Sequence, residues 1–140
     1  MDASWFKAMA DDARTRPDVY RRLGFGDLRL VVEEQDDARV RRFGLVLDGY
    51  DVVSAGELED VESFQPDATI SGPRATWDEM AENIRGNGGA DLGHTLNALS
   101  IAEAPLKVSS ADPLGRDKFF RYAETLQTLF DSLAREPITV

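Results

Sequence analysis

A stretch of alternating apolar and polar residues between positions 27 and 58 constrains the fold more than any other feature of the sequence. Alternation with a period of two is typical of a strand with one buried face. Asp48-Gly49 interrupts the pattern, and this dipeptide favours a type I′ hairpin turn, in which both central residues need a positive φ. We therefore predict an antiparallel meander with strands at residues 27–33, 39–47 and 50–58.

Helix signals lie on both sides of this meander. We expect Ser4 to cap a first helix, Pro17 to begin a second one and Gly24 to end it, so that residues 1–24 form N-terminal helices. Apolar residues three and four positions apart predict another helix after the meander, which the run Gly86-Asn87-Gly88-Gly89 ends.

The most regular helix pattern is near the C-terminus. Asp112 and Pro113 suit the first positions of a helix, and an apolar stripe then continues until Pro137 stops it. Residues 112–135 are therefore predicted as one C-terminal helix.

Two more strands, at residues 67–71 and 104–110, complete the predicted sheet, and a short helix with Leu92, Leu96 and Leu99 lies between them. This order of elements predicts one α+β domain over residues 1–140. Its five-stranded sheet consists of the antiparallel meander plus two further strands, and helices cover it.

The inventory of reactive side chains is small, because the 140 residues include no Cys and one His. The missing thiols exclude disulfides, thiolate zinc sites and cysteine nucleophiles. A site with several His ligands is excluded within one chain. We expect no metal site and no cofactor.

The formal net charge is −10, and both halves of the chain are acidic. Nucleic-acid binding needs clustered Lys and Arg, so it is not expected. No apolar run has the roughly 20 residues of a membrane span, and residues 1–5 carry no signal-peptide pattern. We expect a cytoplasmic protein without stable membrane insertion.

His94 is the one candidate for acid–base chemistry. Asp91, one helical turn earlier, is placed to orient the imidazole. The pair would serve a small isomerase or hydrolase of the NTF2-like type. The other interpretations are a histidine that caps or lines a helix, and a polar group at the mouth of a pocket; no nucleophile motif accompanies it.

An acidic segment covers residues 48–67, where no Lys or Arg occurs. Its carboxylates alternate with apolar residues on predicted strands, which is typical of a solvated outer face. The same segment is a candidate docking surface for a basic protein partner, and the chain would then be an accessory subunit of a metabolic enzyme.

Apolar side chains from three predicted helices have to share one sheet. Such residues form either a filled core or the lining of a plastic apolar pocket, and periodicity does not distinguish the two. The residues concerned are Trp77, Met80, Ile84, Leu92, Leu96, Leu99, Phe119, Phe120, Tyr122, Leu126, Phe130 and Leu133.

The arrangement resembles the sterol carrier protein 2 (SCP-2) domain over roughly residues 18–133. The resemblance is carried by the hairpin at residues 43–49, the run Pro66-Asp67-Ala68-Thr69-Ile70, the helix that opens at Thr76-Trp77, the segment Leu106-Lys107-Val108 and the final helix. It implies a five-stranded sheet and a hydrophobic tunnel for sterols, fatty acids or acyl-CoA. The positions that would line the tunnel are Trp77, Met80, Ile84, Leu96, Leu99, Phe119, Tyr122, Leu126 and Phe130.

We therefore expect a non-catalytic carrier that holds a hydrophobic ligand, of the fatty-acid, acyl-CoA or sterol-like kind, in an apolar tunnel. His94 or Tyr122 would orient the polar end of the ligand. The NTF2-like enzyme that uses Asp91 and His94, and the accessory subunit, remain the alternatives.

Overall fold

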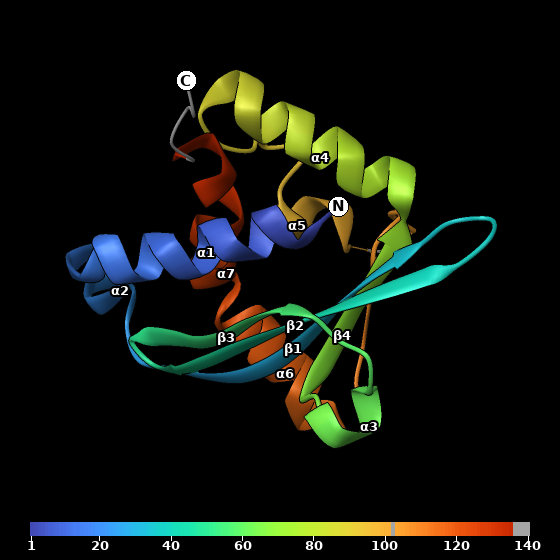
Figure 1. Cartoon of the computed structure of the whole chain (residues 1–140), viewed down its shortest axis with the longest axis horizontal. Coiled ribbons are helices and arrows are strands. Elements are labelled where there is room, and N and C mark those ends of the chain that lie inside the picture. Colours follow the sequence, from blue (N-terminus) through green and yellow to red (C-terminus); the bar gives the residue numbers. More distant parts are fainter. Residues whose placement is uncertain (102, 136–140) are drawn as a thin grey trace.

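The computed structural model describes residues 1–101 and 103–135 and shows a sheet with helices packed on it (Figure 1). Pro137, expected to stop the last helix, lies outside the described residues. The elements are α1 Ala3–Thr15, α2 Pro17–Leu23, β1 Gly26–Gln35, β2 Val40–Gly49, β3 Asp51–Glu57, α3 Val61–Phe64, β4 Ala68–Pro73, α4 Arg74–Asn87, α5 Leu96–Leu99, β5 Lys107–Ser109, α6 Pro113–Arg121, α7 Ala123–Asp131 and a 3₁₀ helix at Ser132–Arg135.

The sheet has five strands in the order β3-β2-β1-β4-β5. β1, β2 and β3 form the antiparallel meander, β4 pairs with β1 in parallel, and β5 pairs with β4 in antiparallel orientation. The predicted α+β class, with a meander plus two further strands, is therefore confirmed.

The hairpin between β2 and β3 is confirmed, but its predicted turn type is wrong. Asp48 pairs with Asp51, so the two loop residues are Gly49 and Tyr50, and of these only Gly49 has a positive φ, at 70°. A type I′ turn needs two such residues. The register of the pair shifts by one residue after Val46, which inserts an extra residue into β3.

One face of the sheet carries most of the core. In Figure 1, α1, α4 and α7 lie on the same side of the sheet, and α3 lies on the other side. The inward side chains of β1 and β2, such as Leu28, Leu30 and Leu45, are fully buried beneath the first group of helices. On the opposite face, Phe64 of α3 covers Val31 and Val46 in a much smaller cluster.

The C-terminal segment is not the single helix predicted for residues 112–135. α6 ends at Arg121, Tyr122 has φ −99° and ψ 17°, and α7 begins at Ala123 with a different axis (Figure 1). Phe119 of α6 and Leu126 of α7 are both fully buried in the same core. α6 packs against β1, β4 and β5, whereas α7 packs against α1, α2 and α5, so one straight helix could not bury both side chains.

Two smaller predictions are also wrong. Asp2 rather than Ser4 caps α1, because its carboxylate accepts hydrogen bonds from both the Ser4 amide, at 2.9 Å, and the Ser4 hydroxyl. The short helix begins only at Leu96, where the Thr95 hydroxyl accepts from the Ala98 amide, and Leu92 is 91% exposed in the preceding turns.

None of the helices in the described part of the chain combines the length and the apolar character that crossing a bilayer requires.

Candidate functional site

Nine of the ten predicted ligand-binding residues come together in one apolar interior between the sheet and the helices. Leu99 and Tyr122 are half-buried at its edge, and His94 lies outside it, near the surface. The fully buried residues are Trp77, Met80, Ile84, Leu96, Phe119, Leu126 and Phe130.

Aromatic rings form the centre of this interior. The ring of Phe130 lies 5.4 Å from that of Trp5 and 6.2 Å from that of Trp77. Both indole N–H groups are satisfied, because Trp5 donates to the Phe130 carbonyl at 2.9 Å and Trp77 donates to the Glu33 carbonyl at 3.1 Å. Trp5 was not predicted as a site residue.

Three hollows among the described residues are lined by none of the ten predicted ligand-binding residues. Two of them are open grooves on the surface, beside the N-terminal end of α1 and beside its C-terminal end. The third is a small hollow that reaches the interior.

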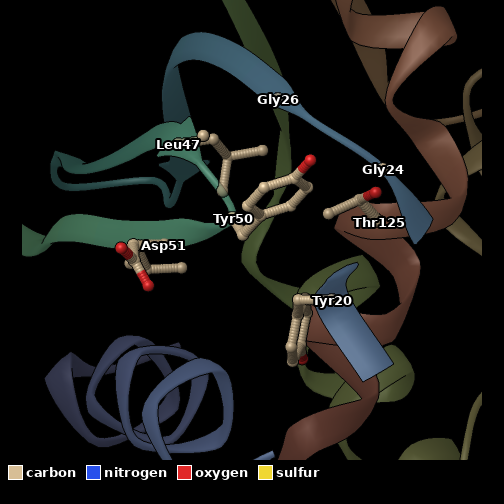
Figure 2. A pocket seen from close by; sticks show the side chains of 9 residues that line it. Tyr20, Gly24, Gly26, Leu47, Tyr50, Asp51 and Thr125 are labelled. Carbon is tan, nitrogen blue, oxygen red and sulfur yellow. The ribbon is translucent and has the colours of Figure 1, made fainter. Parts of the chain in front are cut away.

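The small hollow lies between the C-terminal end of α2, the β2–β3 turn and α7 (Figure 2). Its volume is about 10 Å³, which is room for roughly one water molecule. Nine residues line it: Tyr20, Gly24, Gly26, Leu47, Gly49, Tyr50, Asp51, Val52 and Thr125. We call it the hairpin hollow.

Aromatic side chains cover the hairpin hollow. In Figure 2 the Tyr50 ring lies between Leu47 and Thr125, with Tyr20 across the opening. Tyr50 is 46% exposed and packs edge-to-face against Phe25, at a ring distance of 6.0 Å, and Phe25 is 62% exposed. The sequence analysis did not predict this contact, because no pattern in the sequence shows that these two aromatic residues, 25 positions apart, meet outside the core.

A buried carboxylate lies on the other side of Tyr20. Asp12 of α1 is 6% exposed and accepts bonds from Arg16 at 2.7 Å, Arg135 at 3.0 Å and the Tyr20 hydroxyl at 2.5 Å. Burial opposes its ionisation, but the bonds from the two guanidinium groups and the hydroxyl outweigh burial and hold the pKa of Asp12 far below its usual range. Burial, together with the Asp12 bond, raises the pKa of Tyr20.

His94 and Asp91 are paired as the sequence predicted. The imidazole Nδ1 lies 2.6 Å from Asp91 Oδ1, and Nε2 lies 3.6 Å from a Glu79 carboxylate oxygen. The Asp91 bond raises the pKa of His94. Since Asp91 also accepts bonds from Asn83 and from the Gly93 amide, the cluster ties the loop after α4 back to α4, and each imidazole nitrogen faces a carboxylate.

The acidic segment 48–67 lies mostly on the surface, with Asp67 half-buried. Some of its carboxylates serve the fold: Glu57 pairs with Arg41, Asp60 caps α3, and Asp67 accepts the Arg29 amide at 2.8 Å. Within residues 1–101 and 103–135, no group of three or more His, Asp or Glu side chains gathers in a way that could hold a metal ion.

The fold and its apolar interior define the chain as an α+β protein with an SCP-2-like fold. A crystal structure of sterol carrier protein 2 matches with a TM-score of 0.66 and 16% identity, covering 94% of this chain and 95% of that one. A solution structure of a conserved hypothetical protein from Thermus thermophilus, described as "possibly sterol carrier protein", matches with a TM-score of 0.64 and 16% identity, covering 94% and 87%. No protein-family model matches the chain, and no curated protein matches its sequence significantly. The predicted SCP-2-like fold is thus confirmed.

Proposed function

We propose that this protein is a non-catalytic carrier that holds a hydrophobic ligand between its sheet and α4, α5 and α7. The observation that carries the proposal is the SCP-2-like fold, which the chain shares over nearly its whole length with a sterol carrier protein 2. The predicted lining residues lie together in the apolar interior of that fold, which supports the proposal.

Binding would derive its free energy from apolar surface removed from water, at about 25 cal/mol per Å². Since the side chains of the interior are fully buried, a ligand has to repack residues such as Met80 of α4. Methionine suits this role, because its unbranched side chain adapts to irregular space.

The test is displacement of a neutral fluorescent probe, Nile red, by unlabelled fatty acids, alcohols and sterols, with native mass spectrometry to count bound molecules. We expect one ligand per chain. A protein that neither binds the probe nor retains any of these amphiphiles would contradict the proposal.

Leu126→Ala and Leu114→Ala form a matched pair for locating the ligand. Leu126 is fully buried in the interior, whereas Leu114 is 69% exposed at the start of α6. We expect Leu126→Ala to change the affinity for the ligand severalfold and Leu114→Ala to leave it unchanged. Equal affinities in both variants would place the ligand elsewhere.

A further inference from the structure

We propose that the hairpin hollow is the entrance for this hydrophobic ligand, and that the entrance favours an amphiphile with an uncharged hydroxyl end over an anionic one. The inference rests on the proposed carrier function and adds a place of entry and a ligand class.

The floor of the hairpin hollow is continuous with the apolar interior. Tyr20 and Leu47 line the hollow and also belong to the main core cluster, and Val52 packs against that cluster. Thr125 precedes the buried Leu126 on α7. An alkyl chain that passes Thr125 therefore meets core side chains directly, without first crossing a polar layer.

The cover of the hairpin hollow is weakly held. Tyr50 and Phe25 are about half or more exposed, so swinging them outward removes little buried surface. In the described part of the chain, the hydroxyl groups of Tyr50 and Thr125 make no hydrogen bond with the protein. Three glycines, Gly24, Gly26 and Gly49, form part of the rim and place no side chain across it.

The charges around the rim also determine which polar group of a ligand the hairpin hollow can accommodate. Its lining includes one charged side chain, the carboxylate of Asp51, and no cation. Figure 2 shows this carboxylate on the side of the hairpin away from Thr125. Asp27 and Asp48, paired across β1 and β2, add negative charge at the same end of the sheet. Lys118, which lies near them, forms an ion pair with Asp27 at 3.3 Å.

A carboxylate or phosphate head group held by the lining residues would thus be desolvated beside Asp51, with no cation among those residues, which is unfavourable. A hydroxyl end can instead exchange hydrogen bonds with the free hydroxyl groups of Tyr50 and Thr125. This contrast favours alcohols over acids of the same chain length.

The selectivity test compares dodecan-1-ol with dodecanoate, both below their aggregation concentrations, as competitors of Nile red. We expect the wild-type protein to bind the alcohol at least tenfold more tightly. Asp51→Lys should shift the ratio towards dodecanoate at least tenfold. Asp37→Lys, the same change in the β1–β2 turn at the other end of these strands, should leave the ratio unchanged.

The entrance test uses stopped-flow binding of Nile red. Thr125→Phe fills the hollow, so we expect association at least tenfold slower than in wild type. Glu124→Phe places the same ring on an exposed neighbouring position of α7 and should leave the rate unchanged. Thermal unfolding of each variant verifies that it is folded.

Equal or tighter binding of dodecanoate, an unchanged ratio in Asp51→Lys, or an unchanged rate in Thr125→Phe would overturn the inference while leaving the carrier function standing. Failure of the wild-type protein to bind either amphiphile and Nile red would overturn both.

Discussion

At the scale of single residues, Asp12 connects parts of the chain that are far apart in sequence. Its carboxylate joins α1 to Tyr20 of α2 and to Arg135, 123 positions away in the 3₁₀ helix. Five hydrogen bonds fill its acceptor sites, two from each arginine and one from the tyrosine. Such a fully satisfied buried carboxylate is costly to replace, because its partners would be left without an acceptor.

We expect Asp12→Asn to lower the free energy of unfolding by about 2–4 kcal/mol, the loss being limited by the partial exposure of both guanidinium groups. Asp11→Asn is the control, because the Asp11 side chain is 47% exposed and pairs with the exposed Arg14, so a change within about 0.5 kcal/mol is expected. Urea unfolding measures both, and equal losses in the two variants would contradict the assigned role.

The Asp12 carboxylate also predicts that the stability of the fold falls at acidic pH. Because the folded pKa of Asp12 lies below its ordinary value of 3.8, the stabilisation is present above that pH and is lost as the pH falls towards the folded pKa. Wild type should therefore lose more stability than Asp12→Asn between about pH 5 and pH 2. Parallel curves for the two proteins would exclude this contribution.

The contribution of His94 to the stability of the fold has the opposite dependence on pH. Its pKa is raised above 6.5 by the Asp91 carboxylate, so the stabilisation is complete below pH 6.5 and is lost as the pH rises through the folded pKa. NMR titration of the imidazole should give a value above 6.5 in wild type and a lower one in Asp91→Asn, which keeps the acceptor oxygen but removes the charge. Asp117→Asn, at an exposed position on α6, should leave the value unchanged.

At the scale of elements, the contact of α6 with the sheet depends on a glycine. A Cβ atom at Gly115 would collide with the Asp67 carbonyl oxygen and lie 2.9 Å from Ser110 Cβ. Backbone cannot yield as a flexible side chain does, so α6 would have to move away from the start of β4.

We therefore expect Gly115→Ala to destabilise the protein by about 2–3 kcal/mol or more, as overpacking does. Gly86→Ala is the matched control in α4, because nothing lies within 4 Å of a Cβ atom there and alanine favours a helix by up to about 1 kcal/mol. Thermal unfolding should move in opposite directions for the two variants, and a stable Gly115→Ala would show that α6 can shift freely.

At the scale of the whole molecule, α7 and the 3₁₀ helix after it connect the core to α1. It packs on the core through Leu126, Leu129 and Phe130, and the following 3₁₀ helix is tied to α1 by the Arg135–Asp12 contact. The central strands β1 and β2 are instead paired with each other over ten residues.

We expect Arg135→Ala to accelerate hydrogen exchange in α7 and the 3₁₀ helix about tenfold or more, and to leave exchange in β1 and β2 unchanged. Arg14→Ala, which removes an exposed i,i+3 pair, should change neither region. Hydrogen-exchange mass spectrometry resolves these segments. Uniform acceleration across the sheet would indicate global destabilisation instead of local opening.

Much of the fold could be predicted from short-range patterns. The alternation of residues 27–58 and the Gly49 turn specified the meander, and Pro17 and Gly24 specified the limits of α2. The helical spacing of Trp77, Met80 and Ile84 also indicated a buried face correctly. The backbone repeats of strands and helices impose these patterns, so they can be recognised within one element.

The tertiary structure decided what depends on contacts between distant segments. The bend at Tyr122 follows from two packing surfaces, the Asp12 cluster joins residues 123 positions apart, and the hairpin hollow forms where α2, a turn and α7 meet. Periodicity reports which face of an element is apolar, but not what that face packs against. The sequence by itself therefore determined most of the elements and their buried faces, and only the packing of those faces decided which segments meet, because that packing depends on residues far apart in the chain.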